Sequence, residues 1–181
     1  MNRIQKILDY NKNFVEQRQY KRYISVKQPQ KKIALLTCMD TRLVELLPAA
    51  LNFKNGDCII IKNAGALITH AFGSVMRSLL VAVYELGAED ILVIGHHDCG
   101  VQGMGAGQLL VKMAERGVER DKLDFMRYCG VDIENWLKGF DNVEQAIART
   151  VDMIKKHPLL PADVRVAGFV MEPATGRLDK V

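Results

Sequence analysis

Three side chains with metal-binding chemistry follow two apolar runs of the sequence. Cys38 comes just after the run 33–36, and His96 and Cys99 come shortly after the run 91–94. Each run has the length and the β-branched content of a buried strand. If the two strands are parallel neighbours, their carboxyl ends meet at one edge of the sheet, which is where open α/β sheets bind ligands. Two thiolates and an imidazole brought together there suit Zn(II).

These three side chains leave one position of a tetrahedral zinc site open. Two thiolates and a neutral imidazole cancel the charge of Zn(II), and three protein ligands with a water are typical of a catalytic site. A structural zinc would take a fourth cysteine or histidine. Cys58 begins a predicted strand, away from the strand ends, and Cys129 lies in a predicted helix, so we interpret both as core residues. We interpret His97 as a surface or packing histidine, with an outward proton path as the alternative.

An acidic and a basic residue follow the first candidate ligand. Asp40 and Arg42 are spaced so that an extended or turning segment allows their side chains to pair. A carboxylate beside zinc either accepts a hydrogen bond from a bound water or binds the metal and closes the site. Bidentate pairing with Arg42 favours the first arrangement, because it holds the carboxylate oxygens off the ion. An ordinary structural salt bridge is the alternative.

The elements that must position these residues alternate between strands and helices. We predict strands at 33–38, 58–61, 91–95 and 164–170, with a hairpin turn at 173–176 leading into Leu178, and helices at 3–18, 43–50, 73–86, up to 116, 120–139 and 141–157. Alternation of this kind predicts an α/β fold. We expect a three-layer sandwich around a mostly parallel sheet of four to five strands, with an antiparallel edge strand.

Length and composition favour one domain over 1–181, in which 1–30 form an N-terminal helical arm that packs on a partner subunit. The net charge is only +4 and the basic residues are scattered, so we expect no nucleic-acid partner. No uninterrupted apolar stretch has the length of a membrane span. The N-terminus lacks the apolar core of a secretory signal. We therefore expect a cytoplasmic protein with reduced cysteines.

Three motifs together resemble those of β-class carbonic anhydrases. In order they are Cys38-x-Asp40-x-Arg42, then Ile61-Lys62-Asn63-Ala64-Gly65, then Gly95-His96-x-x-Cys99-Gly100. The short chain and the form of the middle motif are similar to the compact archaeal and bacterial branch, and the resemblance runs from about residue 30 to the hairpin at 175–178. Two positions depart from that branch: Ala66, where it commonly has Asn, and His97, where it commonly has Thr.

This resemblance implies one Zn(II) per subunit, bound by Cys38, His96 and Cys99. It implies that Asp40 and Arg42 act in catalysis beside the metal. The reaction it implies is the reversible hydration of CO2 to bicarbonate and a proton through a zinc-bound hydroxide, since zinc brings the pKa of its water toward about 7. The implied assembly is a homodimer or a higher homo-oligomer.

We further predict that Lys62, Gly65 and Gly100 contact the substrate. Two other functions remain open at this point. The same site could hydrolyse carbonyl sulfide or carbon disulfide, which are linear like CO2. Alternatively, the chain could be a non-catalytic zinc protein in which Asp40 is the permanent fourth ligand.

Overall fold

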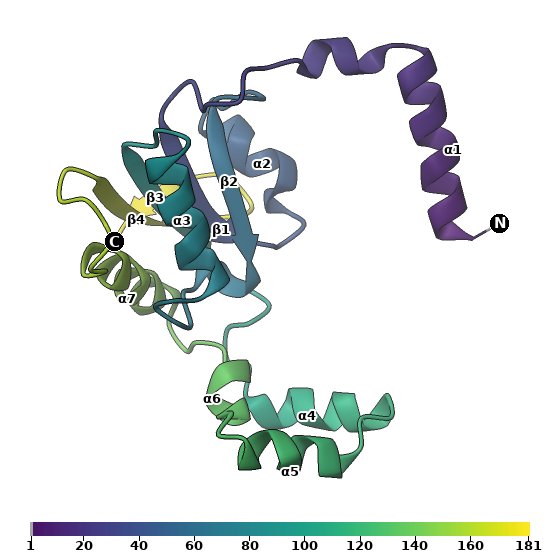
Figure 1. Ribbon diagram of the computed structural model, residues 1–181, viewed down its shortest axis with the longest axis vertical. Coiled ribbons are helices and arrows are strands. Elements are labelled where there is room, and N and C mark those ends of the chain that lie inside the picture. The colour runs from purple at the N-terminus through teal and green to yellow at the C-terminus, as the bar shows by residue number, and fades with distance from the viewer. Residues whose placement is uncertain (1) are drawn as a thin grey trace.

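A computed structural model describes residues 2–181 of the chain (Figure 1). Its centre is a five-stranded sheet in the order β2-β1-β3-β4-β5. β2, β1, β3 and β4 pair in parallel and β5 is antiparallel to β4. The strands span β1 Ile33–Cys38, β2 Cys58–Asn63, β3 Asp90–His96, β4 Arg165–Met171 and β5 Leu178–Lys180. The predicted α/β fold with an antiparallel edge strand is therefore confirmed.

The two central strands form the most deeply buried part of the sheet. Residues 34–38 of β1 are all buried, as are residues 93–96 of β3. Strands covered on both faces read as continuous apolar runs, which is why these two could be recognised from the sequence. β1 lies between β2 and β3, so the carboxyl ends of β1 and β3 are neighbours.

Helices α2, α3 and α7 pack around this sheet. α3 contacts β1 and β2, whereas α7 contacts β3 and β4. A 3-10 turn, η2 (Ala64–Ala66), follows β2 and lies against β1 and β3. The bounds of the three helices are α2 Leu43–Ala50, α3 Ser74–Tyr84 and α7 Val143–Lys155.

The N-terminal segment extends away from the sheet. α1 (Arg3–Glu16) has no buried residue, and the 3-10 helix η1 (Gln19–Tyr23) connects it toward the core. Figure 1 shows α1 standing apart from the sheet and from the helices around it, with only η1 beside it. No helix within residues 2–181 has the length and apolar character needed to cross a membrane.

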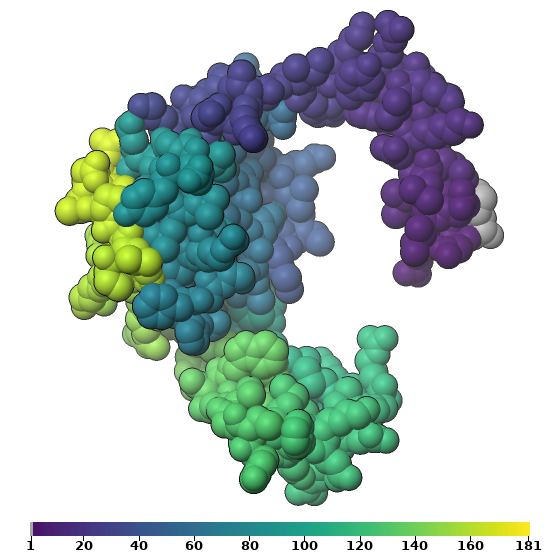
Figure 2. Space-filling model, in the orientation of Figure 1, coloured from purple at the N-terminus to yellow at the C-terminus, as the bar shows by residue number. Residues whose placement is uncertain are grey.

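A helical lobe, residues 106–137, also stands away from the sheet (Figure 1), and in the space-filling view it projects from the main body of the molecule (Figure 2). It contains α4 Ala106–Glu115, α5 Arg120–Tyr128 and α6 Ile133–Leu137. Two neighbouring segments, 101–104 and 139–140, connect it to the rest of the chain. We call them the neck. The Gly103 N–H donates to the Phe140 carbonyl (2.8 Å), and the Gly139 N–H donates to the Met104 carbonyl (2.9 Å).

The predicted single helix over 120–139 is wrong. α5 ends at Tyr128 and α6 begins only at Ile133. Between them Gly130 has φ +84°, a left-handed conformation that ends a helix and that glycine adopts without strain. Asp132 then caps α6 by accepting a hydrogen bond from the Asn135 N–H.

Candidate metal centre

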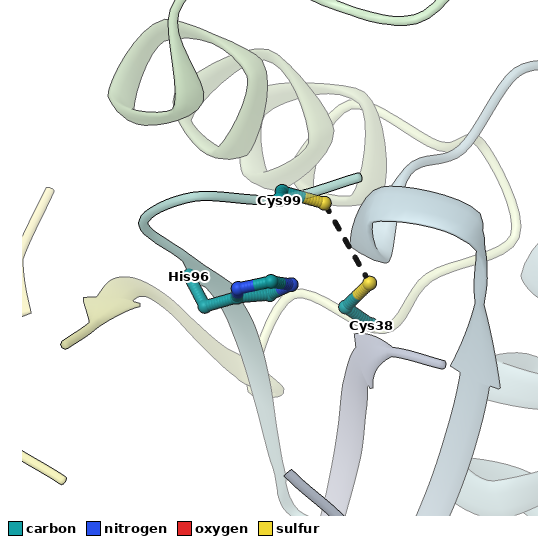
Figure 3. A group of neighbouring side chains, drawn as sticks. All are labelled: Cys38, His96 and Cys99. Atoms are coloured by element: carbon teal, nitrogen blue, oxygen red, sulfur yellow. Dashed lines mark hydrogen bonds between the residues drawn. The ribbon is translucent and has the colours of Figure 1, made fainter. Parts of the chain in front are cut away.

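The fold brings Cys38, His96 and Cys99 together at the carboxyl edge of the sheet (Figure 3). Cys38 ends β1, His96 ends β3, and Cys99 lies in the loop after β3. All three are buried, and their ligand atoms lie within 4.8 Å of one another. The parallel pairing of β1 with β3 is the reason that they converge.

The spacing and chemistry of these atoms fit a tetrahedral zinc ion. The two Sγ atoms lie 3.7 Å apart, and both cysteines are free thiols. Two sulfurs at about 2.3 Å from a tetrahedral zinc would be about 3.8 Å apart. The sulfur separation is therefore that of two ligands to one metal.

The histidine ring supports the same interpretation. Nδ1 lies 2.8 Å from the carbonyl oxygen of His97, to which it donates as an N–H. The lone pair of the neutral ring is then on Nε2, which is buried without a hydrogen-bond partner. Figure 3 shows the ring directed toward the cysteines. Buried nitrogens without partners are rare in folded proteins, and a metal ion would satisfy this one.

The site stabilises one thiolate without any metal. The hydrogen bond from Cys99 lowers the pKa of Cys38 to about 4 against the effect of burial, with help from His96 and from the backbone N–H groups of Asp40 and Gly65. The same contact with Cys38, together with burial, raises the pKa of Cys99. A divalent cation would displace the proton that the two sulfurs share.

His96 shows the same balance of effects. Burial disfavours the imidazolium, but this is outweighed by the attraction of the nearby Cys38 sulfur and by the hydrogen bond to the His97 carbonyl, so the pKa of His96 is raised. The surroundings of His96 and Cys38 therefore stabilise a positively charged group at this centre.

Gly65 supports Cys38 through its backbone. It lies in η2 with φ +81°, and a Cβ atom there would lie 2.8 Å from Cγ2 of Val101. Only glycine allows this close approach without strain. The next residue, Ala66, also has a positive φ of 59°, a conformation that Asn tolerates better than Ala.

Asp40 and Arg42 form the predicted pair at the edge of the centre. Arg42 donates from Nε to Oδ1 of Asp40 (3.1 Å) and from Nη2 to Oδ2 (2.9 Å), so the contact is bidentate. These hydrogen bonds lower the pKa of Asp40 to about 2 and raise the pKa of Arg42. Asp40 is thus a carboxylate at any physiological pH, and both of its oxygens are occupied by Arg42.

Sequence reasoning missed a third member of this group, Asp98. Its carboxylate accepts from Nη1 of Arg42 (2.8 Å) and its carbonyl accepts from Nη2 (2.7 Å). The signal in the sequence was an acidic residue between two candidate ligands, His96 and Cys99.

The remaining candidate residues lie in varied positions. Lys62 is exposed on the edge strand β2, and Gly100 is exposed beside Cys99, whereas Gly65 is buried at the centre. A role of these three in binding substrate stays a prediction. His97 is half-buried and its backbone N–H donates to the Met171 carbonyl.

The two other cysteines take no part in the centre. Cys58 pairs in register with Ile33 at the opposite end of the sheet, as predicted, and is half-buried. The interpretation of Cys129 as a core residue is wrong, because it is exposed just after the last residue of α5. The early end of that helix places it on the surface of the lobe.

The fold and the site together are those of a candidate metal-dependent enzyme: a mostly parallel α/β sheet carries a cysteine, a histidine and a cysteine at its carboxyl edge, beside an Asp–Arg pair. The family model for carbonic anhydrase matches residues 33–178. "Putative carbonic anhydrase YtiB" of Bacillus subtilis is 52% identical over 181 residues, covering 100% of this chain and 97% of that protein. The chain therefore belongs to the carbonic anhydrase family.

Solved structures and other relatives place it more closely within the family. β-Carbonic anhydrase isoform I of Trichomonas vaginalis superposes with a TM-score of 0.90 at 30% identity, covering 99% of this chain and 97% of that one. The chain thus has the β-class fold. A protein of Acidithiobacillus thiooxidans named carbon disulfide hydrolase is 27% identical over 155 residues, covering 82% of this chain and 76% of that protein.

Proposed function

We propose that this protein is a zinc enzyme that reversibly hydrates CO2 to bicarbonate and a proton. One observation carries the proposal: the unpartnered Nε2 of His96 and two cysteine sulfurs 3.7 Å apart lie beside a carboxylate held by an arginine. In the proposal Cys38, His96 and Cys99 hold one zinc ion per subunit. When bound, zinc supplies the Lewis acidity that makes water ionise near neutral pH.

Asp40 orients the attacking water in this mechanism. Its carboxylate is ionised and can accept one hydrogen bond from water, which directs the oxygen lone pair toward the carbon of CO2. Arg42 keeps Asp40 ionised and fixes its orientation through two hydrogen bonds. A bidentate arginine contact adds geometric specificity to its energy. The proton released on hydration then leaves to solvent.

The pairing with Arg42 also argues against Asp40 as a permanent metal ligand. Both carboxylate oxygens accept hydrogen bonds from the guanidinium, and ligation would require at least one of these contacts to weaken. We therefore favour a catalytic site over a closed, non-catalytic zinc site.

Hydrolysis of carbon disulfide or carbonyl sulfide is the second candidate. The named carbon disulfide hydrolase among the relatives favours it, and the same residues could orient water toward either linear substrate. The much higher identity to the Bacillus subtilis protein is the reason that we place CO2 first.

A stopped-flow assay with a pH indicator tests the proposal on zinc-loaded protein. We expect fast proton release on mixing with CO2, and slow or no sulfide release from carbonyl sulfide and carbon disulfide. The reverse ranking would favour the second candidate. Zinc-loaded protein that is inactive on all three substrates would overturn the enzymatic proposal.

We also propose that the protein functions in the cytoplasm as a homodimer or a larger assembly of identical subunits. Large apolar side chains on α1 are exposed in the single chain, among them Ile4, Ile7 and Leu8, each more than half exposed. Exposed apolar surface of this kind is typical of an interface. In the proposal α1 packs on a second copy.

A further inference from the structure

Asp98 completes a set of contacts around the guanidinium of Arg42. All three guanidinium nitrogens donate: Nε to Asp40, Nη1 to the Asp98 carboxylate, and Nη2 to both residues. Asp40 follows β1 and Asp98 follows β3. Arg42 therefore connects the two loops that carry the candidate metal ligands.

The backbone at Asp98 is arranged for this contact. Its φ is +52°, a left-handed conformation that few residues other than Gly, Asn and Asp adopt readily. Its carbonyl is thereby within 2.7 Å of Nη2 while its carboxylate reaches Nη1. The residue thus holds one edge of the guanidinium with two different groups.

An exposed ion pair by itself stabilises a protein little, and the Asp98 side chain is 87% exposed. The contact can nevertheless determine the orientation of the Arg42 guanidinium. Arg42 is itself 42% exposed, and within residues 2–181 the structure gives its Nη1 no acceptor other than Asp98. Without that carboxylate Nη1 has no acceptor, and the guanidinium is held only by its contacts with Asp40 and with the Asp98 carbonyl.

We propose that Asp98 is a positioning residue that holds Arg42 in the orientation in which it binds both oxygens of Asp40. The catalytic consequence rests on the function proposed above: Asp98 would act on the reaction only through Arg42. Its contact with Arg42 can be tested without any substrate.

The test compares Asp98→Gly with Asp98→Asn in zinc-loaded protein. Glycine removes the carboxylate but adopts a positive φ freely, whereas asparagine also tolerates that φ and keeps a neutral oxygen that can accept from Nη1. Asp90→Asn is the matched control, because it removes a carboxylate that pairs with Arg165 at the opposite end of β3.

Hydrogen exchange at Nε of Arg42, followed by NMR in ¹⁵N-labelled protein, is the first readout. The signal is assigned by its absence in Arg42→Lys. We expect faster exchange in Asp98→Gly, an intermediate rate in Asp98→Asn, and the wild-type rate in Asp90→Asn. All three variants should keep full zinc and wild-type circular dichroism. Wild-type exchange in Asp98→Gly would overturn the proposal.

CO2 hydration is the second readout. We expect kcat/KM to fall about 10- to 100-fold in Asp98→Gly, as is usual when a residue that orients a metal site is removed, and to be partly restored in Asp98→Asn. In an Arg42→Ala background the change Asp98→Gly should have no further effect. An equal fall in that background would show that Asp98 acts independently of Arg42. If the wild type does not hydrate CO2, the proposed function fails and the exchange rates alone decide the role of Asp98.

Discussion

Oδ2 of Asp40 lies 3.7 Å from Nε2 of His96. The carboxylate therefore borders the nitrogen that is free to bind a metal, and it is near enough to influence whatever binds there. Arg42, on the other side, occupies both carboxylate oxygens. The function of the centre therefore depends on whether Asp40 stays paired with Arg42 or binds the metal itself.

Substitution of a ligand should remove the metal. We expect Cys38→Ser, His96→Ala and Cys99→Ser each to lose stoichiometric zinc and all but a trace of CO2 hydration. Cys58→Ser is the control, because Cys58 lies at the opposite end of the sheet, and it should keep both. Zinc is measured by mass spectrometry on protein purified in reductant. A full complement of zinc in any of the three ligand variants would contradict the assignment.

Asp40→Asn should keep zinc and lose activity. The amide removes the charge that Arg42 pairs with and leaves the water without its oriented acceptor. We expect kcat/KM to fall by about 10- to 100-fold, with zinc content unchanged. The assay is stopped-flow hydration from pH 7 to 9. Unchanged turnover across that range would rule out the role of Asp40.

Removal of zinc should destabilise the fold. Zinc at 100 times its Kd would stabilise the native state by about 2.7 kcal/mol, which corresponds to roughly 5–10 °C in Tm for a chain of this size. Chelation should therefore lower the Tm of the wild type by about that amount, as followed by circular dichroism. His96→Ala serves as the reference, and its Tm should not respond to zinc or chelator.

The stability of the protein at alkaline pH should depend on the ionisation of Cys58. Burial, together with the charge of Asp57, raises the pKa of Cys58 from 9.0 to about 11. The unfolded chain would ionise this thiol near pH 9, whereas the folded chain resists until about pH 11. Its contribution to stability is thus complete below pH 9 and is lost as the pH rises through 11. The free energy of unfolding, measured with urea at each pH, should fall more steeply with pH in the wild type than in Cys58→Ser between pH 9 and pH 11. Outside that window the two proteins should show the same pH dependence.

Alkylation gives an independent measure of the same shift. At pH 8 the folded protein should hold about 100-fold less thiolate at Cys58 than the unfolded chain, so iodoacetamide should label it slowly. Exposed Cys129 serves as the internal reference for reagent activity. Peptide mass spectrometry follows both residues, and half-maximal labelling of Cys58 near pH 9 would contradict the prediction.

The exposed arm should govern assembly. Ile7 is 67% exposed in the single chain, so Ile7→Glu should weaken association while leaving the helical content of the subunit unchanged. Gln5→Glu adds the same charge to the same helix and is the control. Light scattering after gel filtration gives the mass of each. A dimer that survives Ile7→Glu and the deletion of residues 2–24 would exclude α1 from the interface.

The centre was predictable because its residues follow strands that are recognisable on their own. β1 and β3 are continuous apolar runs, and parallel pairing brings their carboxyl ends together whatever the rest of the chain does. Cys38, His96 and Cys99 had to meet once those two strands were neighbours. Asp40 and Arg42 lie two residues apart, so their pairing is local and needed no knowledge of the fold.

Asp98 and the helical lobe show where such reasoning ends. The contact of Asp98 with Arg42 spans 56 residues and depends on a left-handed backbone, which nothing in the local pattern specifies. The apolar periodicity of 120–139 continues through Gly130, so it indicates one helix although the backbone turns there. Apolar periodicity shows which face of a helix is buried. It does not show whether the element that covers this face lies in the same chain.

Because of the neck, residues 106–137 form an insertion that is joined to the rest of the chain at one place. Its two segments are bonded to each other, so the chain leaves the sheet and returns to it at almost the same place. We therefore expect that residues can be added to or removed from the lobe without moving these two segments, and that Cys99, which precedes the neck, keeps its position. Variation in chain length among relatives should concentrate in this insertion, and a short linker grafted between the two segments should leave the metal centre intact.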